Sequence, residues 1–512
     1  MCFVLEMALR GGSEKLHSQI ASEITRLIAE GLIGCGYPLP STRLLSEHLG
    51  VSRNTVLRAY ENLAAEGIVE MRPPRGTFVS EKLPADIPAA PFAKLFKQTP
   101  KNLEGRPSGK LEFPAGAKET KYDFQYERIS KDVVPSAMWR RITFEKMRAL
   151  PNEMAKADHP AGSWDLRCAI AEYLGPSRSI KIAPEQVIVT AGLQQSISVA
   201  VSMFSGPRHR AVVEQPRYSG FDAILDNFGY ETFPVEADRY GLRTDLLPEV
   251  SSSLVCVTAG RQFPFGGTLP HDRREELYLW AKRSGAHILD AEIQNDYRYD
   301  GLLPAALMRD DQYGRTMMAG SFTSSLGSGV RLGYLVVPMD AIGRAVHAAA
   351  TLGNTCGWLD QAVLANFIKT GGYKHHLLRL RKTMMARKDA AISEISERFG
   401  DIDIVGANGG SFFIWRLPPG FPGSDEVVRI LKAAGLVVSS FNSGLVSCEG
   451  SILSDQRHLM VGYGGMAVDE LRRAAAQMAD VLEARFGSQR VRGNQVSVPS
   501  DTVLPADLGM AP

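Results

Sequence analysis

The sequence predicts a multidomain protein, in which a small helical domain with a β-hairpin precedes a large α/β domain. The chain has 512 residues, 44% of them hydrophobic and 22% charged, which is long for one ordinary domain and apolar enough for a large core. Near the N-terminus apolar residues recur at helical spacing, whereas from about residue 122 short β-rich runs alternate with longer helical ones. Many prolines separate the two regions. These observations favour two folded domains on a tether.

Residues 13–80 form the predicted first domain. Its first helix lies within 13–32, and apolar residues at helical spacing then continue on both sides of Gly50-Val51. Two amphipathic helices that meet at a short turn containing glycine are typical of a helix-turn-helix. Gly67 ends the second of these helices, and β-type runs at 68–71 and 77–80 enclose a basic tip, 72–76. This hairpin is interpreted as a wing.

Polar residues at the start of the second helix are candidates for reading DNA. Ser52 is a good N-cap, because its hydroxyl accepts from an unpaired backbone N–H. Side chains in the first turns can reach base edges or phosphates, and arginines outside this helix suit backbone contacts. The alternative is an ordinary helix bundle with a tight turn, which the wing disfavours. The candidate DNA-binding residues are Arg43, Ser52, Arg53, Asn54, Thr55, Arg58, Arg72, Arg75 and Gly76.

The charge of this segment is nearly balanced. From Arg43 to Arg75 there are five arginines and four acids, so the strongly basic footprint of many DNA-binding domains is missing. Its positive surface must therefore be local, and tight binding is expected to need two copies.

The rest of the chain divides into a linker, a body and a tail. Residues 81–121 are rich in proline, lysine, alanine and glycine, a composition typical of a semi-extended tether. Strands interleaved with helices predict a parallel sheet covered on both faces, followed from about 341 by a smaller α+β lobe, so that the body spans 122–486. The polar tail, 487–512, is expected to be disordered. The strands predicted for the sheet are 187–190, 211–214, 254–258, 287–289, 316–319 and 332–337.

Composition excludes several classes of function. The six cysteines are scattered without a C-x-x-C pair, so neither a disulfide framework nor a metal site is expected. No run is long and apolar enough to cross a bilayer, and the short N-terminal apolar stretch is interrupted by Glu6. The sequence therefore predicts a cytoplasmic protein without a membrane partner.

Two glycine-containing loops in the body suit an anion. Residues 190–195 follow a strand and open a helix, which leaves free N–H groups and a positive dipole end. Residues 320–325 and 329–334 add hydroxyl groups and Arg331. Ordinary strand-to-helix turns would produce similar sequences, and that alternative stays open on the residues alone.

The first domain closely resembles the winged helix-turn-helix of GntR-type bacterial transcription regulators. The resemblance runs from about residue 15 to 79 and includes PSTRLLSEHLGVSRNTVLRAYENLAAEGIVEMRPPRGTFV. In that family the arginine after the Pro-Ser-x pair, the polar first turn of the second helix and the wing glycine touch DNA. The resemblance assigns these roles to Arg43, to residues 52–55 and to Gly76.

The body resembles the fold-type-I aminotransferase domain of MocR-type regulators, from about residue 122 to 486. Matching segments include 158–162, 186–195, 214–218, 297–301 and 329–334. The family joins a GntR-like head to an aminotransferase-like body that binds pyridoxal 5′-phosphate and forms head-to-tail homodimers. The resemblance implies that Tyr218 would stack on the ring. The phosphate would be held by Gly192, Leu193, Gln194, Ser321 and Arg331.

Three departures from the family pattern fall in this site. Where the family has Gly-Thr-Phe-Ser-Lys, this chain has Gly-Ser-Phe-Thr-Ser, so Ser324 replaces the lysine that forms the Schiff base. Ala291 stands in place of the aspartate that pairs with the pyridine nitrogen, and Ile293 in place of a tyrosine. A pyridoxal enzyme needs the lysine as its covalent anchor and the carboxylate to maintain the electron sink. Rotation of Asp290 into the vacated role is an alternative.

These features predict a transcription regulator that binds double-stranded DNA and carries a catalytically degenerate aminotransferase-like body. The body could hold pyridoxal 5′-phosphate without a covalent bond, hold another small anionic or phosphorylated effector, or hold nothing. One rival reading is an active pyridoxal-dependent aminotransferase with an accessory DNA-binding head, and another is a constitutive DNA binder whose body only dimerises. The operator, the effector and the sign of regulation are left open.

Overall fold

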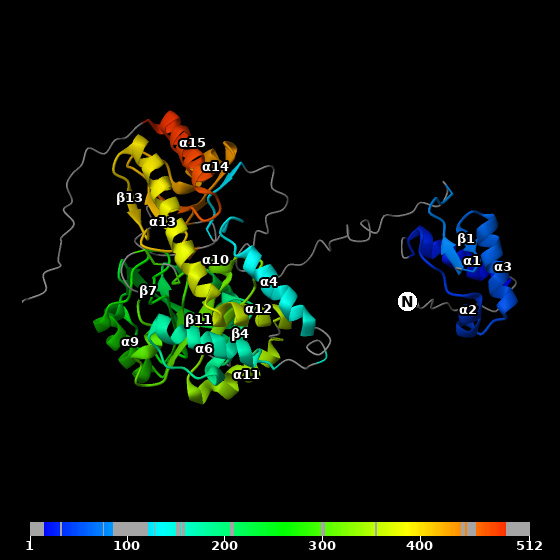
Figure 1. Cartoon of the computed structure of the whole chain (residues 1–512), viewed down its shortest axis with the longest axis horizontal. Helices are drawn as coiled ribbons and strands as arrows, with labels where there is room; N and C mark the ends of the chain where they lie inside the picture. The colour runs from blue at the N-terminus through cyan, green and yellow to red at the C-terminus, as the bar shows by residue number, and fades with distance from the viewer. Residues whose placement is uncertain are drawn as a thin grey trace, which may run out of the picture. The chain divides into compact units, whose positions relative to one another are not determined.

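The computed structural model describes two compact units, residues 1–106 and 107–512 (Figure 1). The DNA-contact candidate Arg75, most of the predicted linker and the predicted tail lie outside the described residues. The structure describes residues 15–30, 33–74, 76–84, 121–126, 128–149, 155, 159–204, 209–296, 298–299, 303–353, 356–441, 446–447 and 457–487.

The first unit is a winged helix-turn-helix, as predicted. Ser41 and Ser52 cap the second and third helices, since each hydroxyl accepts a hydrogen bond from the N–H three residues later. Gly50 ends α2 with a φ of 63°, a left-handed conformation that favours glycine. The elements are α1 (Leu16–Ala29), α2 (Thr42–Leu49), α3 (Arg53–Ala65), β1 (Val69–Arg72) and β2 (Gly76–Val79), with β1 and β2 antiparallel.

A small apolar core fixes this unit. Ile20 and Ile24 of α1 are fully buried together with Val56 and Tyr60 of α3. The Tyr60 hydroxyl donates a hydrogen bond to the Pro40 carbonyl oxygen at 2.7 Å, which ties α3 to the segment before α2. The polar first turn of α3 therefore projects from a well-anchored helix.

An eight-stranded sheet forms the centre of the second unit, in the order β4-β12-β11-β10-β9-β5-β7-β8. The predicted parallel sheet was wrong in part, because β12 runs antiparallel to both of its neighbours and β8 runs antiparallel to β7. All six predicted strands are present. The strands are β4 (Val187–Thr190), β5 (Arg210–Gln215), β7 (Glu231–Asp238), β8 (Gly241–Leu242), β9 (Leu254–Val257), β10 (His287–Ala291), β11 (Thr316–Ser321) and β12 (Gly333–Val336).

Helices cover both faces of this sheet, as predicted. Along β4, Val187 and Val189 join one apolar cluster with α6 and α12, whereas Ile188 joins another with α7, α8 and α11. A further cluster packs α9 against β9 and β10. These helices are α6 (Trp164–Arg178), α7 (Leu193–Ser202), α8 (Gly220–Asn227), α9 (His271–Ser284), α11 (Ile342–Thr351) and α12 (Trp358–Lys369). Two further helices are α4 (Ser136–Lys146), which packs on α12, and the short α10 (Thr323–Leu326).

The predicted smaller α+β lobe contains a four-stranded sheet, β13-β14-β18-β16, with α13, α14 and α15. The body begins in this lobe, because β3 pairs in parallel with β15. The lobe elements are α13 (Gly372–Phe399), α14 (Ser424–Ala433), α15 (Val468–Phe486), β3 (Tyr122–Asp123), β13 (Asp403–Val405), β14 (Phe412–Arg416), β15 (Leu436–Val437), β16 (Ser439–Ser440), β17 (Val446–Ser447) and β18 (His458–Gly462). Across the described ranges, every helix is too short or too polar to span a bilayer.

Candidate functional site

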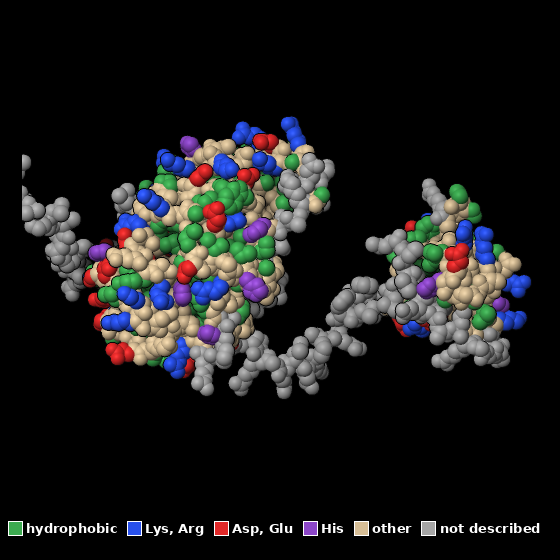
Figure 2. All heavy atoms as spheres, turned by 90° about the horizontal axis from the view of Figure 1, so that it is seen from below, with side chains coloured by type: hydrophobic (Ala, Val, Ile, Leu, Met, Phe, Trp, Pro, Cys, Tyr) green, Lys and Arg blue, Asp and Glu red, His purple; other side chains and the backbone are tan. Residues whose placement is uncertain are grey.

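The exposed start of α3 is the candidate DNA-reading surface. The Ser52 hydroxyl accepts a hydrogen bond from the Thr55 N–H at 3.1 Å and contacts the Thr55 hydroxyl at 2.8 Å. Arg53, Asn54 and Arg58 are exposed. Figure 2 shows basic and acidic side chains on the same face of this unit. The Ser52 cap thus orders the first turn of α3, and the exposed long side chains of that turn can enter a groove.

The other described candidates flank this turn. Arg53 Nε donates to the Thr42 hydroxyl at 3.2 Å, which joins α3 to the start of α2. Arg43 forms an ion pair with Glu47, and Arg72 forms one with Glu70. At the wing tip, Gly76 has a φ of 109° with open space around the position of a Cβ, so the backbone conformation rather than crowding selects glycine.

In the body, the two predicted anion loops meet. Gly192 precedes α7 with a φ of 103°, and a Cβ at this position would lie 3.9 Å from both the Ser321 and the Thr323 hydroxyl oxygens. Ser321 donates to Thr323 at 2.9 Å, and the Thr323 N–H donates back to Ser321 at 3.1 Å. The start of a ten-residue helix with two hydroxyls beside it suits a phosphate or carboxylate. No sequence signal distinguishes Thr323 from the other hydroxyl residues of the 320–325 loop.

Two further candidates lie beside this loop pair. Gln194 Nε2 donates to the Tyr218 hydroxyl at 3.4 Å, so the α7 start and β6 (Arg217–Tyr218) come together. The Tyr218 ring packs edge-on against Phe263, and its backbone pairs with Val446 of β17. Leu193 is the first residue of α7, and Arg331 is exposed just before β12.

The three departures occupy apolar or small-residue surroundings. Ala291 ends β10 and is 1% exposed, and Ile293 is 3% exposed; both belong to the apolar cluster that includes Phe263. Ser324 lies in α10, between the half-buried Thr323 and the buried Ser325. The apolar neighbours of Ala291 and Ile293 do not suit a charged pyridinium ring.

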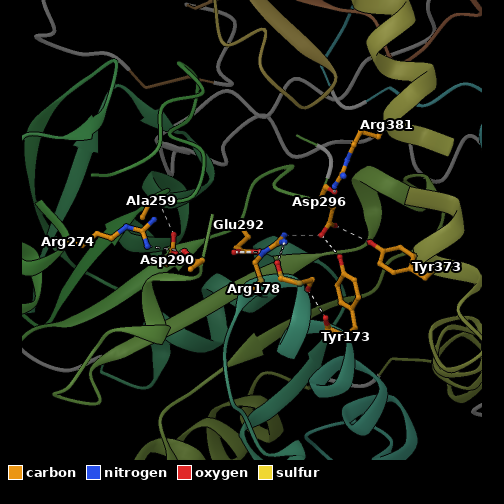
Figure 3. Close-up of polar contacts among 11 residues, drawn as sticks. Tyr173, Arg178, Ala259, Arg274, Asp290, Glu292, Asp296, Tyr373 and Arg381 are labelled. Atoms are coloured by element: carbon orange, nitrogen blue, oxygen red, sulfur yellow. Dashed lines mark hydrogen bonds and ion pairs between the residues drawn. The ribbon is translucent and has the colours of Figure 1, made fainter. Parts of the chain in front are cut away.

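Asp290 is already engaged elsewhere. Its carboxylate accepts the Ala259 N–H at 3.0 Å, and burial raises its pKa to about 7 (Figure 3). On β5, which lies on the other side of β9, Glu214 accepts from the Thr258 N–H at 3.1 Å and from the Thr258 hydroxyl at 2.6 Å, and burial raises its pKa to about 8. Both carboxyls hold the backbone that follows β9. This engagement opposes a rotation of Asp290 into the place of the aspartate that Ala291 replaces.

A buried charge cluster was missed by sequence reasoning. Arg178, at the end of α6, forms ion pairs with Glu292 at 2.7 Å and Asp296 at 3.1 Å, and Figure 3 shows the three side chains converging. Tyr173 and Tyr373 donate to Asp296 at 2.8 and 3.1 Å. These residues are far apart in the sequence and follow no local motif, so only the fold identifies them.

The same cluster reaches the helix that carries Ser324. The Tyr373 hydroxyl lies 2.9 Å from the Ser325 hydroxyl, and His376 bonds the Ser325 carbonyl oxygen at 2.5 Å. Since the carbonyl can only accept, His376 Nε2 is the donor. The α10 backbone is therefore held from α13 and, through Asp296, from α6.

Comparison with known protein families assigns both units. Residues 16–79 match the bacterial regulatory proteins of the gntR family, and residues 130–480 match aminotransferase class I and II. Among solved structures, a multiple substrate aminotransferase from Thermococcus profundus superposes with a TM-score of 0.64 at 19% identity, covering 72% of this chain and 92% of that one. This similarity shows the fold.

Curated relatives share both units. The transcriptional regulator TauR of Rhodobacter capsulatus is 30% identical over 84% of this chain and 89% of its own length. The pyridoxine biosynthesis transcriptional regulator PdxR of Corynebacterium glutamicum is 29% identical over 91% of this chain and 95% of its own. The probable rhizopine catabolism regulatory protein MocR of Rhizobium meliloti is 29% identical over 98% of each chain.

Proposed function

Because this chain belongs to the MocR-type group of GntR transcription regulators, we propose that it regulates transcription through its winged helix while its body senses rather than catalyses. It acts on double-stranded DNA in the cytoplasm. One observation supports the DNA-binding part of this proposal: the first turn of α3 is capped and exposed, and the same unit carries the wing.

The roles of the head residues follow from their positions. Arg53 and Asn54 stand at the α3 start, where a recognition helix meets base edges, whereas Arg75 belongs to the wing sequence and suits phosphate. Footprinting of the DNA upstream of the protein's own gene would define the operator and the spacing of its half-sites.

Two arginine substitutions test these roles. Arg53→Ala is expected to weaken operator binding by about 1–3 kcal/mol and to relax specificity at one position. Arg75→Ala should instead weaken binding to all duplexes and reduce the slope of log affinity against log salt by about one. Fluorescence anisotropy on operator and scrambled duplexes measures both effects. Operator affinity that is unchanged in both variants would exclude this DNA-binding mode.

The body is proposed to lack transaminase activity. Ser324 has no amine to condense with an aldehyde, and Ala291 offers no carboxylate to a pyridine nitrogen. Pyridoxal 5′-phosphate would supply an electrophilic aldehyde and an electron sink, and the residues present match only its phosphate and one ring face. Gly192, Ser321 and Tyr218 therefore support non-covalent binding of the cofactor or of another small anion.

An active aminotransferase is the second candidate, favoured by the fold and the loop pair around Gly192. An absorbance scan of the purified protein separates the two proposals, because a cofactor bound as an imine absorbs near the visible range and is fixed by borohydride. We expect no fixed cofactor. A reducible cofactor found on a lysine by mass spectrometry would favour the enzyme.

The body is further proposed to form a homodimer. The nearly balanced charge of one head calls for a second head on the same DNA, since two linked sites gain affinity from effective concentration.

A further inference from the structure

Two arginines beside the recognition helix are paired with glutamates. Arg43 Nε lies 3.0 Å from Glu47 Oε1, and Arg72 Nη2 lies 2.6 Å from Glu70 Oε2. The side chains of the first pair are 81% and 62% exposed, and both side chains of the second are 46% exposed. Both pairs face solvent and can exchange partners.

The recognition helix itself is different. Arg53 donates to the neutral Thr42 hydroxyl, and Arg58 is exposed. Within the part of the head that the structure describes, neither forms an ion pair with an acid. Arg43 of α2 and Arg72 of the wing therefore have acidic partners, whereas Arg53 and Arg58 of the recognition helix have none among the described residues.

Helix stability does not explain the pair on α2. Arg43 is in the first turn, close to the positive end of the helix dipole, and Glu47 is in the last turn, close to the negative end. The order of charges, with the acid four residues after the base, is also the weaker one for a helical pair. Glu47 therefore stabilises α2 less than the reverse order of charges would, and it neutralises a candidate phosphate contact.

The pair on the wing follows strand geometry. Glu70 and Arg72 are two positions apart on β1, so they share one face, and both Arg72 Nε and Nη2 donate to the same Glu70 oxygen at 2.9 and 2.6 Å. The guanidinium also lies 5.5 Å from the Phe78 ring centre. Arg72 is thus held along the hairpin and must leave Glu70 to reach a phosphate.

We propose that Glu47 and Glu70 determine specificity by suppressing contact between the head and the backbone of any duplex. This inference rests on the proposed DNA-binding function. Binding without sequence recognition depends almost entirely on the charge that the protein presents to the phosphates. The pairing of Arg43 and Arg72 with glutamates therefore weakens this kind of binding. At the operator, base contacts fix the register of the head, and each arginine exchanges its glutamate for an aligned phosphate.

The test uses the full chain with Glu47→Gln, Glu70→Gln and the double variant. Affinity is measured on the duplex protected in the footprint and on a scrambled duplex of the same composition, over a range of salt. Glu61→Gln is the matched control, because Glu61 is exposed in the same head and forms no ion pair that the structure describes. Equal melting temperatures verify that all variants fold.

The double variant should bind the scrambled duplex about threefold to tenfold more tightly at low salt, and the operator less than about twofold more tightly. Specificity then falls, while Glu61→Gln leaves it unchanged. An equal gain on both duplexes, a gain no larger than that of the control, or a loss of operator affinity would each overturn the inference. A wild-type protein that does not discriminate between the duplexes would instead refute the proposed function.

Discussion

At the scale of single residues, local chemistry could be predicted well from the sequence. Ser52 caps α3, and Gly67 follows the helix with a φ of 72°, because capping and left-handed turns depend on neighbours in the chain. Partners from distant segments could not be predicted. In the sequence, Glu47 and Glu70 are recognisable only as charges, not as partners of arginines. The proximity of Thr323 to the Gly192 loop depends on β12 running antiparallel to its neighbours.

Restoring a lysine at Ser324 tests the proposed degeneration of the body. Ser324→Lys is expected to recover a borohydride-fixed adduct with added pyridoxal 5′-phosphate, because the loop pair at Gly192 and the Tyr218 ring remain. It should not recover transamination, since Ala291 supplies no carboxylate. Absorbance and a coupled assay with amino acids measure the two properties separately. Adding Ala291→Asp and Ile293→Tyr should improve retention, and turnover in the single variant would contradict the account.

The buried carboxyls predict a pH dependence of stability. Glu214 and Asp290 have folded-state pKa values raised by burial to about 8 and about 7, so the folded body binds protons that the unfolded chain releases near pH 4. Their contribution to the free energy of unfolding is complete below about pH 4 and is lost as the pH rises toward 8. Glu214→Gln and Asp290→Asn should therefore flatten the decline in stability between pH 5 and 8.

Urea unfolding at several pH values checks this effect as the difference between wild type and variant. The difference between wild type and variant is needed because His287 acts in the opposite sense. Burial lowers its pKa to about 4, so its contribution to the free energy of unfolding is lost as the pH falls below about 6.5. Its effect is common to both proteins and cancels. An identical pH profile in the variants would show that the two carboxyls do not titrate in this window.

At the scale of elements, the sequence identified the strands of the sheet better than their directions. Alternation of strands and helices predicted parallel pairing, but no helix lies between β11 and β12 apart from the four residues of α10, so the chain returns antiparallel. The strand β7 was not predicted, because its three acids and Pro234 obscure the β pattern.

The Arg178 cluster predicts strong coupling between α6 and the segment after β10. Arg178→Met leaves Glu292 and Asp296 buried without their cation, which should cost about 3–5 kcal/mol in the free energy of unfolding. Arg273→Met is the matched control, since its pair with Asp238 is partly exposed and should cost about 1 kcal/mol or less. Urea denaturation followed by tyrosine and tryptophan fluorescence compares them. Equal losses would refute a special role for the cluster.

At the scale of the whole molecule, composition and charge predicted two units and the need for two heads. The proposed homodimer predicts that residues 1–84 alone bind the operator much more weakly than the full chain, about 10²-fold or more, because a single head loses effective concentration. Analytical ultracentrifugation and anisotropy measure assembly and affinity together. A monomeric full chain with undiminished affinity would exclude this role of the body.

The pairing of β3 with β15 has a mechanical consequence. The described part of the body begins at this short strand. On one side the strand is bonded to the C-terminal lobe through Tyr122 N to Gly435 O at 3.1 Å and Phe124 N to Val437 O at 2.8 Å, and on the other side through Gly462 N to Phe124 O at 2.8 Å. A pull on the chain that precedes Lys121 therefore acts first on this lobe. A pull along the strand loads these bonds in shear, all at once, so the lobe resists it as a unit.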